Sequence, residues 1–284
     1  MKSLEKIIQE KTDLIASSDD EFISSLSELL PDNANELKKY IADLDTSGGK
    51  LVSNAYNRQK LIGIRKFLIE ILRKDYNINF NAYIKRFEDI AGLNVEIQAI
   101  QGIEINASEF GFAKKIMTDL VADQLSLDNV VDQTVRPGIQ QILYKHVMGG
   151  YNRKDATTAI ETFLKDKDYI NKWSKVVARD TIADYNGMIQ DQLTAQYDYD
   201  GYFYTGTIIE TSRPQCRRWV EDLGGFITMD ELRKEVERFA DAQGYDQNKK
   251  LSVNDFGRVR GGYNCRHDAT AGFMSPRIRR KKGL

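Results

Sequence analysis

The sequence has few of the residues that cross-link chains, cluster around metals or interrupt helices. Its 284 residues include only 2 Cys, 2 His and 4 Pro. Two cysteines cannot form a disulfide framework, so we expect packing or partners to stabilise a chain kept in a reducing compartment. Two histidines leave few ways to build a histidine-based catalytic group. Scarce proline permits long helices, because proline lacks the N–H that a helix interior needs.

An excess of charge of one sign is also missing. The 41 Lys and Arg nearly balance the 42 Asp and Glu, for a formal net charge of -1, which excludes a protein that coats nucleic acid over its whole surface. The sequence has no apolar run near the roughly 18 residues of a membrane span. Charged residues follow Met1, so we expect neither a membrane anchor nor a secretion signal. A hydrophobic share of 41% excludes wholesale disorder, and the length favours two domains.

Hydrophobic periodicity predicts that the chain begins with a long α-helical region. Apolar residues recur at spacings of three and four, as in an amphipathic helix. The clearest examples are Leu61, Ile64, Leu68 and Leu72. This pattern predicts helices over residues 3–16, 19–30, 33–44, 51–76, 82–100, 108–124, 127–148, 154–166 and 171–197. A turn at residues 47–49 precedes the fourth helix, and Pro137 should break or kink the helix over 127–148.

The composition changes after Tyr199. Residues 201–209 are rich in aromatic and β-branched side chains, which favours a strand, and glycine is frequent from Gly224 onward. Thr228, followed three residues later by Glu231, forms a capping-box pattern and predicts a helix over 228–243 between short strands. We therefore predict an α+β fold, in which a long, mainly α-helical N-terminal region is followed by a small α+β C-terminal module.

The common catalytic motifs do not occur. The sequence contains no Gly-x-Ser-x-Gly nucleophile elbow, no Gly-x-x-x-x-Gly-Lys-Ser/Thr phosphate loop and no dinucleotide fingerprint. His146 lies in an apolar helical pattern, which favours a packing role over a catalytic one. The glycine cluster at 257–262 favours a tight turn. Neighbouring acids such as Glu221 and Asp222 fit a solvated face, so we expect a protein that is not an enzyme.

One set of residues has the chemistry of metal ligands. Cys265 and His267 lie two positions apart, and Cys216 lies about 50 residues upstream. Two sulfurs and an imidazole nitrogen suit Zn²⁺, which prefers four such ligands in a tetrahedron. The fourth would be a carboxylate such as Asp222 or Asp268, or a water molecule. The alternatives are two buried, inert cysteines with a surface histidine, or a disulfide between the cysteines. Zinc is thus the one cofactor that the residues suggest.

The one concentrated basic segment lies close to residue 284. Its five positive charges belong to Arg277, Arg279, Arg280, Lys281 and Lys282. Clustered cations suit docking to a nucleic-acid backbone or an acidic partner, although charge alone does not read base sequence. The alternative is a terminus that is merely solvated.

Four segments of the last part of the chain follow one another in an order that matches a known family. They are Ala178-Arg179-Asp180-Thr181 through Asn186 on a helix, Thr211-Ser212-Arg213-Pro214 after a strand, Cys216-Arg217 with Leu223-Gly224-Gly225, and Asn264-Cys265-Arg266-His267. Together they resemble the phage Mu F-like minor head protein domain, also called the phage head morphogenesis domain. The sequence departs from the family pattern at Arg213, where many members have a cysteine, and at His267, which replaces the last cysteine. A four-ligand zinc site of the family type would therefore lack one ligand here.

The resemblance implies a function and a division of the chain. Residues 1–170 would be a helical region for assembly or portal contacts, residues 171–275 the Mu F-like domain, and residues 276–284 a basic tail. The protein would be a minor structural protein of a tailed bacteriophage virion that acts in head assembly, DNA packaging or DNA delivery. Its partners would be the portal protein and capsid subunits, with packaged DNA at the tail. It would lie in the capsid interior or at the portal vertex, and in the host cytoplasm during assembly.

Two other classes of protein stay open at this point. The first is a phage-borne enzyme or toxin effector, because the family's domain is sometimes joined to toxin modules. The second is a zinc-dependent nucleic-acid-binding module, built on the Cys and His residues and the basic tail. Activity assays would separate out the first class, and metal analysis with a Cys265→Ser control would test the second.

Overall fold

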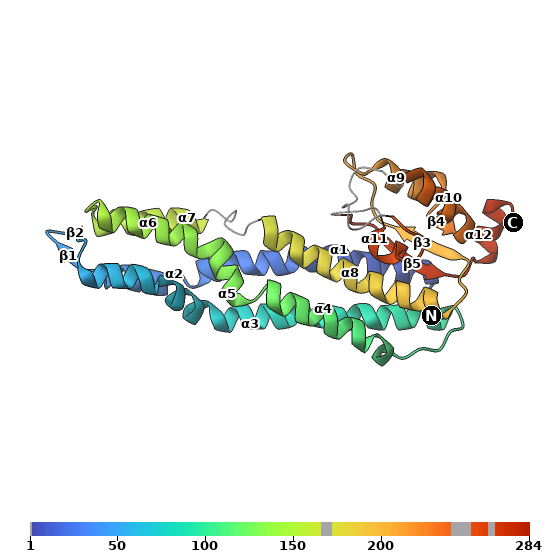
Figure 1. Cartoon of the computed structure of the whole chain (residues 1–284), viewed down its shortest axis with the longest axis horizontal. Coiled ribbons are helices and arrows are strands. Elements are labelled where there is room, and N and C mark those ends of the chain that lie inside the picture. Colours follow the sequence, from blue (N-terminus) through green and yellow to red (C-terminus); the bar gives the residue numbers. More distant parts are fainter. Residues whose placement is uncertain (1, 166–171, 240–250, 261–264) are drawn as a thin grey trace. The chain divides into compact units, whose positions relative to one another are not determined.

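The computed structural model describes residues 2–165, 172–239, 251–260 and 265–284. Within these residues the predicted fold class is confirmed, since a long helical region precedes a small three-stranded sheet with short helices around it (Figure 1). The parts of the predictions that fall on residues 166, 171, 240–244, 261, 262 and 264 lie outside the described residues.

Helices make up most of the chain before residue 197. Their bounds are α1 (Leu4–Asp32), α2 (Ala34–Ala42), α3 (Ala55–Ile100), the 3-10 turn η1 (Ala107–Phe110), α4 (Gly111–Gln124), α5 (Leu127–Val130), the π-helical turn η2 (Val131–Val135), α6 (Arg136–Met148), α7 (Arg153–Lys165) and α8 (Lys172–Gln196). A two-residue hairpin of β1 (Thr46–Ser47) and β2 (Lys50–Leu51) separates α2 from α3. Gly48 and Gly49 have positive φ angles of 57° and 78° in its turn, which confirms the predicted turn.

Two pairs of predicted helices are single helices in the structure. The predicted helices over 3–16 and 19–30 form α1, in which the hydroxyl of Ser18 donates to the carbonyl of Leu14 and leaves the helical path uninterrupted. The predicted helices over 51–76 and 82–100 form α3. Tyr76, expected to end the first of them, is buried, and its hydroxyl donates to the carbonyl of Leu125. Polar residues therefore do not end these two helices, because their side chains bond to carbonyls of the same helix, as in Ser18, or of another segment, as in Tyr76.

The predicted break near Pro137 is confirmed. The helical path from residue 127 to 148 is divided by the π-helical turn η2, and Pro137 occupies the first turn of α6. Proline cannot donate to a carbonyl four residues earlier, so it is tolerated where a new helix begins.

The C-terminal module is built on an antiparallel sheet. Its strands are β3 (Gly201–Thr205), β4 (Phe226–Thr228) and β5 (Asp268–Gly272), in the order β4-β3-β5, so β3 is central. The register pairs Tyr202 with Ile227 on one side and with Ala271 on the other. The associated helices are α9 (Pro214–Arg217), the π-helical turn η4 (Arg218–Asp222), α10 (Met229–Phe239), α11 (Phe256–Val259) and α12 (Pro276–Lys282).

Two sequence predictions for this module can be compared with its structure. The strand expected over 201–209 ends at Thr205, because Gly206 adopts a φ of 142° that breaks the strand. The capping box of α10 is confirmed. The Glu231 N–H donates to the Thr228 hydroxyl at 3.1 Å, and the Glu231 carboxylate accepts from the Thr228 N–H at 2.9 Å.

Compactness divides the chain into two units that interleave along the sequence. Unit 1 comprises Met1–Asp19, Ile84–Leu120 and Arg179–Leu284, and unit 2 comprises Asp20–Tyr83 and Val121–Ala178. Unit 1 thus joins the C-terminal module to parts of α1 and α3. The predicted boundaries at residues 170 and 275 remain predictions about independent folding.

Each unit has an apolar interior of its own. In unit 2, the residues predicted to form a helical stripe, Leu61, Ile64, Leu68 and Leu72, are all buried. In unit 1, Ile7 and Ile8 of α1 pack with Ile97 of α3 and with Phe203 and Phe226 of the sheet. The second cluster joins the sheet to the two helices by burying apolar area, which is the main stabilising contribution available. None of the helices in the described part of the chain has the length and apolar character of a membrane span.

Candidate metal centre

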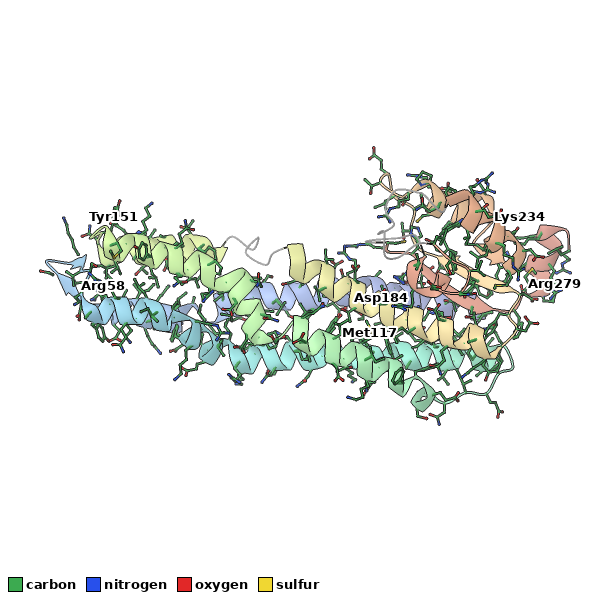
Figure 2. All side chains as sticks on the ribbon, in the orientation of Figure 1. Arg58, Met117, Tyr151, Asp184, Lys234 and Arg279 are labelled. Carbon is green, nitrogen blue, oxygen red and sulfur yellow. The ribbon has the colours of Figure 1, made fainter. Side chains whose placement is uncertain are left out.

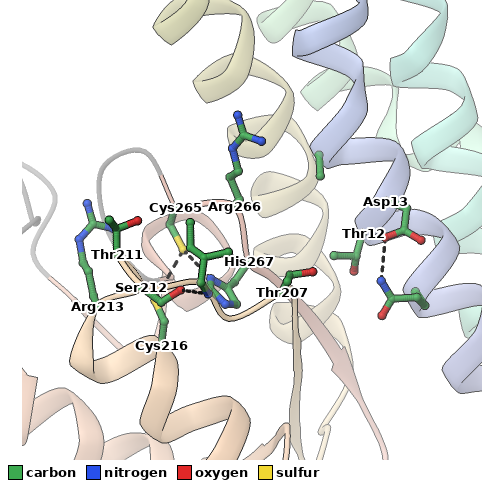
Figure 3. A pocket seen from close by; sticks show the side chains of 14 residues that line it. Thr12, Asp13, Thr207, Thr211, Ser212, Arg213, Cys216, Cys265, Arg266 and His267 are labelled. Atoms are coloured by element: carbon green, nitrogen blue, oxygen red, sulfur yellow. Dashed lines mark hydrogen bonds between the residues drawn. The ribbon is translucent and has the colours of Figure 1, made fainter.

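Three residues of unit 1 bring sulfur and nitrogen atoms together. Cys216 lies on the short helix α9, which Pro214 begins, while Cys265 and His267 lie just before β5. The Cys216 and Cys265 Sγ atoms are 3.9 Å apart, and His267 Nδ1 is 3.6 Å from Cys265 Sγ (Figure 3). All three side chains are buried, and their ligand atoms lie within 4.8 Å of one another. The structure thus unites the three residues that sequence chemistry had grouped.

Two of the alternative interpretations are excluded. Both cysteines are free, so no disulfide joins them. His267 is 7% exposed, so it is not a surface histidine. The interpretation of the cysteines as buried, inert side chains is the one that still competes with metal binding.

Tyr204 of β3 contacts all three candidate ligands. Its hydroxyl lies 3.3 Å from Cys216 Sγ and 3.5 Å from Cys265 Sγ. Its ring stacks on the His267 imidazole with centroids 5.3 Å apart and planes 10° from parallel. Gly206 makes room on another side, since a Cβ there would lie 2.7 Å from the His267 ring. Strand β3 and the glycine that ends it therefore fix the orientation of the imidazole.

The two thiols differ in how readily they ionise. The hydrogen bond with Cys265, together with burial, raises the pKa of the Cys216 thiol. The same hydrogen bond, aided by His267, lowers the pKa of the Cys265 thiol well below its ordinary value. Burial raises the pKa of Tyr204 well above its ordinary value, so its hydroxyl stays protonated and can donate to sulfur. The contact between the two thiols, together with the nearby His267, thus favours a thiolate within the pair, and thiolate is the form of cysteine that binds metals.

The residues present fit a metal ion. Two sulfurs and an imidazole nitrogen are typical ligands of Zn²⁺ and other thiophilic ions. The His267 nitrogen that faces the sulfurs is Nδ1, at 3.6 Å from Cys265 Sγ; the other nitrogen, Nε2, is buried without a hydrogen-bond partner among the described residues and points away from that ion position. The cluster can therefore hold a metal ion.

Neither carboxylate proposed as a fourth ligand belongs to this cluster. The Asp268 carboxylate accepts from Asn186 Nδ2 at 2.6 Å and pairs with Lys11 Nζ at 3.2 Å. The Asp222 side chain is 63% exposed and pairs with Arg218 at 3.4 Å. Among the described residues, the group of ligand atoms within 4.8 Å comprises Cys216, Cys265 and His267 alone.

A pocket of about 510 Å³ opens on the cluster. The three candidate ligands line it, together with Thr207, Thr211, Ser212, Arg213 and Arg266 from the segments that flank them. Gln9, Thr12 and Asp13 of α1 line the opposite side (Figure 3). The pocket lies entirely within unit 1, and its wall is part polar and part apolar.

The five basic residues predicted to bind nucleic acid lie on or beside the helix α12. Ser275 caps this helix, and Ile278 packs against the apolar cluster of unit 1. Lys282 bonds to both carboxylate oxygens of Glu231 at 2.7 Å. Arg279, labelled in Figure 2, pairs with Asp200 at 3.1 Å. The other three, Arg277, Arg280 and Lys281, are exposed. The segment is therefore a docked helix in which two of five charges are engaged within unit 1.

Sequence reasoning missed a buried polar network beside the cluster. Lys11 of α1 is fully buried, and its ammonium contacts Asp268 of β5, Asn94 of α3 and Asn186 of α8 at 3.1–3.3 Å. Gln190 of α8 extends the network, since its amide donates to Asn94 Oδ1 at 2.8 Å and accepts from the Ala271 N–H at 2.9 Å. The available signal was a lysine one turn after Ile7 and Ile8, on the buried side of α1.

Burial affects the charge state of this network. Desolvation lowers the pKa of Lys11, and the Asp268 carboxylate opposes that shift. A lysine in this setting is held by its partner, because an isolated buried charge is very costly.

His146, the other histidine of the chain, lies in unit 2, where its Nδ1 is 2.7 Å from the carbonyl of Ile142.

Comparison with known proteins identifies no relative of this chain. No family model matches it, and neither the curated proteins nor the solved structures provide a match. The segments that resemble the Mu F-like domain therefore have only their own residues in support.

Proposed function

We propose that the chain is a minor structural protein of a tailed bacteriophage virion, of the head morphogenesis type, and that a zinc ion organises its C-terminal module. The observation that carries the proposal is the convergence of Cys216 with Cys265 and His267. These residues belong to two of the segments that resemble the Mu F-like domain, and Cys216 precedes the other two by 49 and 51 residues. Their convergence supports a common structural purpose for both segments.

The distances within the cluster support zinc as the metal. Tetrahedral Zn²⁺ with Zn–S bonds of about 2.3 Å and a Zn–N bond of about 2.0 Å places two sulfurs about 3.8 Å apart and a sulfur and nitrogen about 3.5 Å apart. The corresponding distances here are 3.9 Å and 3.6 Å. These two distances match those around a tetrahedral zinc ion, and the third pair, Cys216 Sγ and the His267 nitrogen, lies within 4.8 Å.

Other resemblance segments have structural roles in unit 1 that fit an assembly module. Asn186 joins the buried network around Lys11, and Arg179 pairs with the nearly buried Asp19 at 2.7 Å. Gly224 and Gly225, with φ angles of 70° and 75°, form the turn into β4. In this proposal the portal protein and capsid subunits are the partners, the virion is the location, and the chain is not an enzyme.

Zinc content provides the first test. We expect about one zinc ion per chain in the purified protein, measured by inductively coupled plasma mass spectrometry. His267→Gln should lose most of the zinc, whereas His146→Gln should keep it, because His146 lies outside the cluster. Equal zinc in the two variants would contradict the assigned ligands.

The virion location has a separate test. Mass spectrometry of purified particles should detect the chain at a few copies per virion, and depletion of the chain should reduce the yield of filled heads. Particles that assemble, fill and infect normally without it would contradict the structural role, whatever the zinc content.

A zinc-dependent nucleic-acid-binding module is the second candidate. The observation that favours it is the exposure of Arg277, Arg280 and Lys281 on one short helix. Replacing all three by glutamine should then weaken binding to duplex DNA and reduce its salt dependence, since each phosphate contact releases a counterion. Binding that is unchanged in this variant would exclude α12 as the interface.

A further inference from the structure

Within the described residues, the candidate metal centre supplies three ligands, whereas zinc takes four. Cys216, Cys265 and His267 also line the pocket of about 510 Å³, so the side of the cluster that is not occupied by protein ligands faces open space (Figure 3). Zinc sites that are closed have four protein ligands, whereas three protein ligands leave a position for water or another ligand.

We propose that a metal ion held by Cys216, Cys265 and His267 keeps one coordination position open to this pocket, and that an oxyanion group, a carboxylate or a phosphate, occupies it. This inference rests on the metal binding proposed above. It differs from a purely structural zinc site, because the bound ion becomes a docking point for a group from outside the chain.

The nearby acids cannot take the open position as the chain is folded. Asp268 is turned into the buried network, where Lys11 and Asn186 hold its two oxygens. Asp13, across the pocket, accepts a hydrogen bond from Gln9 at 2.7 Å and does not belong to the group of ligand atoms within 4.8 Å. Among the residues that the structure describes, no carboxylate therefore competes with an outside ligand for the ion.

The pocket wall fits an anion. Arg213 and Arg266 both line it, against the single acid Asp13. The positive charge of Arg213 is close enough to act on the Cys216 thiol. Guanidinium groups bind carboxylates and phosphates through paired, charge-assisted hydrogen bonds. An oxyanion on the ion would thus find two cations among the residues that line the pocket.

Hydroxyl groups add donors at the mouth of the pocket. Thr207, Thr211 and Ser212 line it beside the arginines. The Ser212 oxygen accepts from the Ile209 N–H at 2.9 Å, which leaves its O–H to donate. The wall therefore combines the metal's open position, two cations and hydroxyl donors, a set that favours oxyanions over apolar ligands.

Cobalt substitution of the full chain tests the proposal. Co²⁺ takes the same ligands as zinc, and its visible absorption reports the coordination of the ion. We expect the bands of the 1:1 cobalt protein to change saturably when inorganic phosphate or acetate is added at constant ionic strength set with perchlorate. A stronger response to phosphate would identify a phosphate group as the ligand, and a stronger response to acetate would identify a carboxylate.

Arginine variants test whether the pocket wall contributes to anion binding or whether the metal ion binds the anion alone. Arg266→Met should weaken anion binding about tenfold, because it removes charge-assisted hydrogen bonds. Its side chain is exposed, so the change should leave folding and cobalt binding intact. Arg277→Met, which removes the same charge from α12, is the matched control and should bind the anions like the unaltered protein.

Three outcomes would overturn the inference. Cobalt bands that neither anion changes would show a closed site, and would leave the zinc proposal standing. Equal anion affinity for Arg266→Met and Arg277→Met would remove the pocket from the site. Failure of the chain to bind cobalt or zinc at all would overturn both this inference and the zinc part of the proposed function.

Discussion

Unit 1 and unit 2 both have apolar interiors, but they differ in where their ion pairs lie. Unit 2 relies on apolar helix stripes and stacked rings, such as Phe22 on Tyr83 with centroids 4.7 Å apart. Its ion pairs, such as that between Arg65 and Asp128, lie at the surface. Unit 1 instead buries the ion pair of Lys11 and Asp268. Apolar contacts tolerate small errors of fit, whereas a buried charge requires its partner in place, so unit 1 should be far more sensitive to single polar changes.

The largest expected effect comes from breaking the buried ion pair. Lys11→Met leaves the Asp268 carboxylate buried without its cation, and the free energy of unfolding should fall by about 3–5 kcal/mol. Urea denaturation followed by circular dichroism measures the loss. Arg65→Met removes an exposed cation from unit 2 and should have a much smaller effect. Equal losses in the two variants would show that the units do not differ as described.

A second, smaller effect concerns the pH dependence of unit 1. Burial raises the pKa of Asp191 to about 7. The charge of Asp255 adds to this rise, whereas the charges of Arg258 and Arg260 oppose it. Because the folded pKa lies above the unfolded one, Asp191 stabilises the fold fully below about pH 4 and loses that contribution as the pH rises towards 7.

Asp191→Asn should therefore remove this dependence of the free energy of unfolding on pH. We expect the variant to gain about 2 kcal/mol on the unaltered protein between pH 4 and pH 7, after allowance for partial exposure of the side chain. Thermal unfolding at a series of pH values measures the difference. Asp128→Asn is the control in unit 2, and a similar gain there would contradict the assignment of the slope to Asp191.

The smallest expected effect sharpens the account of the basic helix. The Lys282 side chain is 13% exposed and bonds to Glu231. Burial raises the pKa of Glu231, but the bonds to Lys282 and Thr228 outweigh burial, so the pKa lies below its ordinary value. Lys282→Gln should cost about 1 kcal/mol or less and should make residues 276–284 easier to cleave with trypsin. Lys281→Gln, at the exposed neighbouring position, should change neither property. Identical cleavage of both variants would favour a tail that is not docked.

Much of the helical fold could be predicted from the sequence because its signal is local. The stripe from Leu61 to Leu72 repeats within a few turns of one helix, so its periodicity is visible without the rest of the chain. Helix ends were less predictable. The polar residues between the predicted helices, such as Ser18, and Tyr76 at the predicted end of one of them do not end a helix, and Tyr76 bonds to the distant Leu125 carbonyl instead.

The candidate site was predictable only where its chemistry is rare. Three soft ligands in a chain with two cysteines and two histidines can be grouped by elimination, and the structure brings Cys216, Cys265 and His267 together. Lysines and asparagines are too common for such reasoning, so the network of Lys11, Asn94 and Asn186 could not be found. Strand β5, Asp-Ala-Thr-Ala-Gly, likewise has only Thr270 among the residues typical of strands and depends on pairing with β3.

The interleaving of the two units has a consequence for synthesis on the ribosome. Ile7 and Ile8 emerge early, but Phe203 and Phe226, their partners in unit 1, are translated much later, and Asp268 later still. Unit 2 already has all of its segments once residue 178 has left the exit tunnel. We therefore expect unit 2 to fold first. Until Phe203 and Phe226 are translated, the apolar residues at the start of α1 stay exposed, and chaperone binding or aggregation can compete with folding.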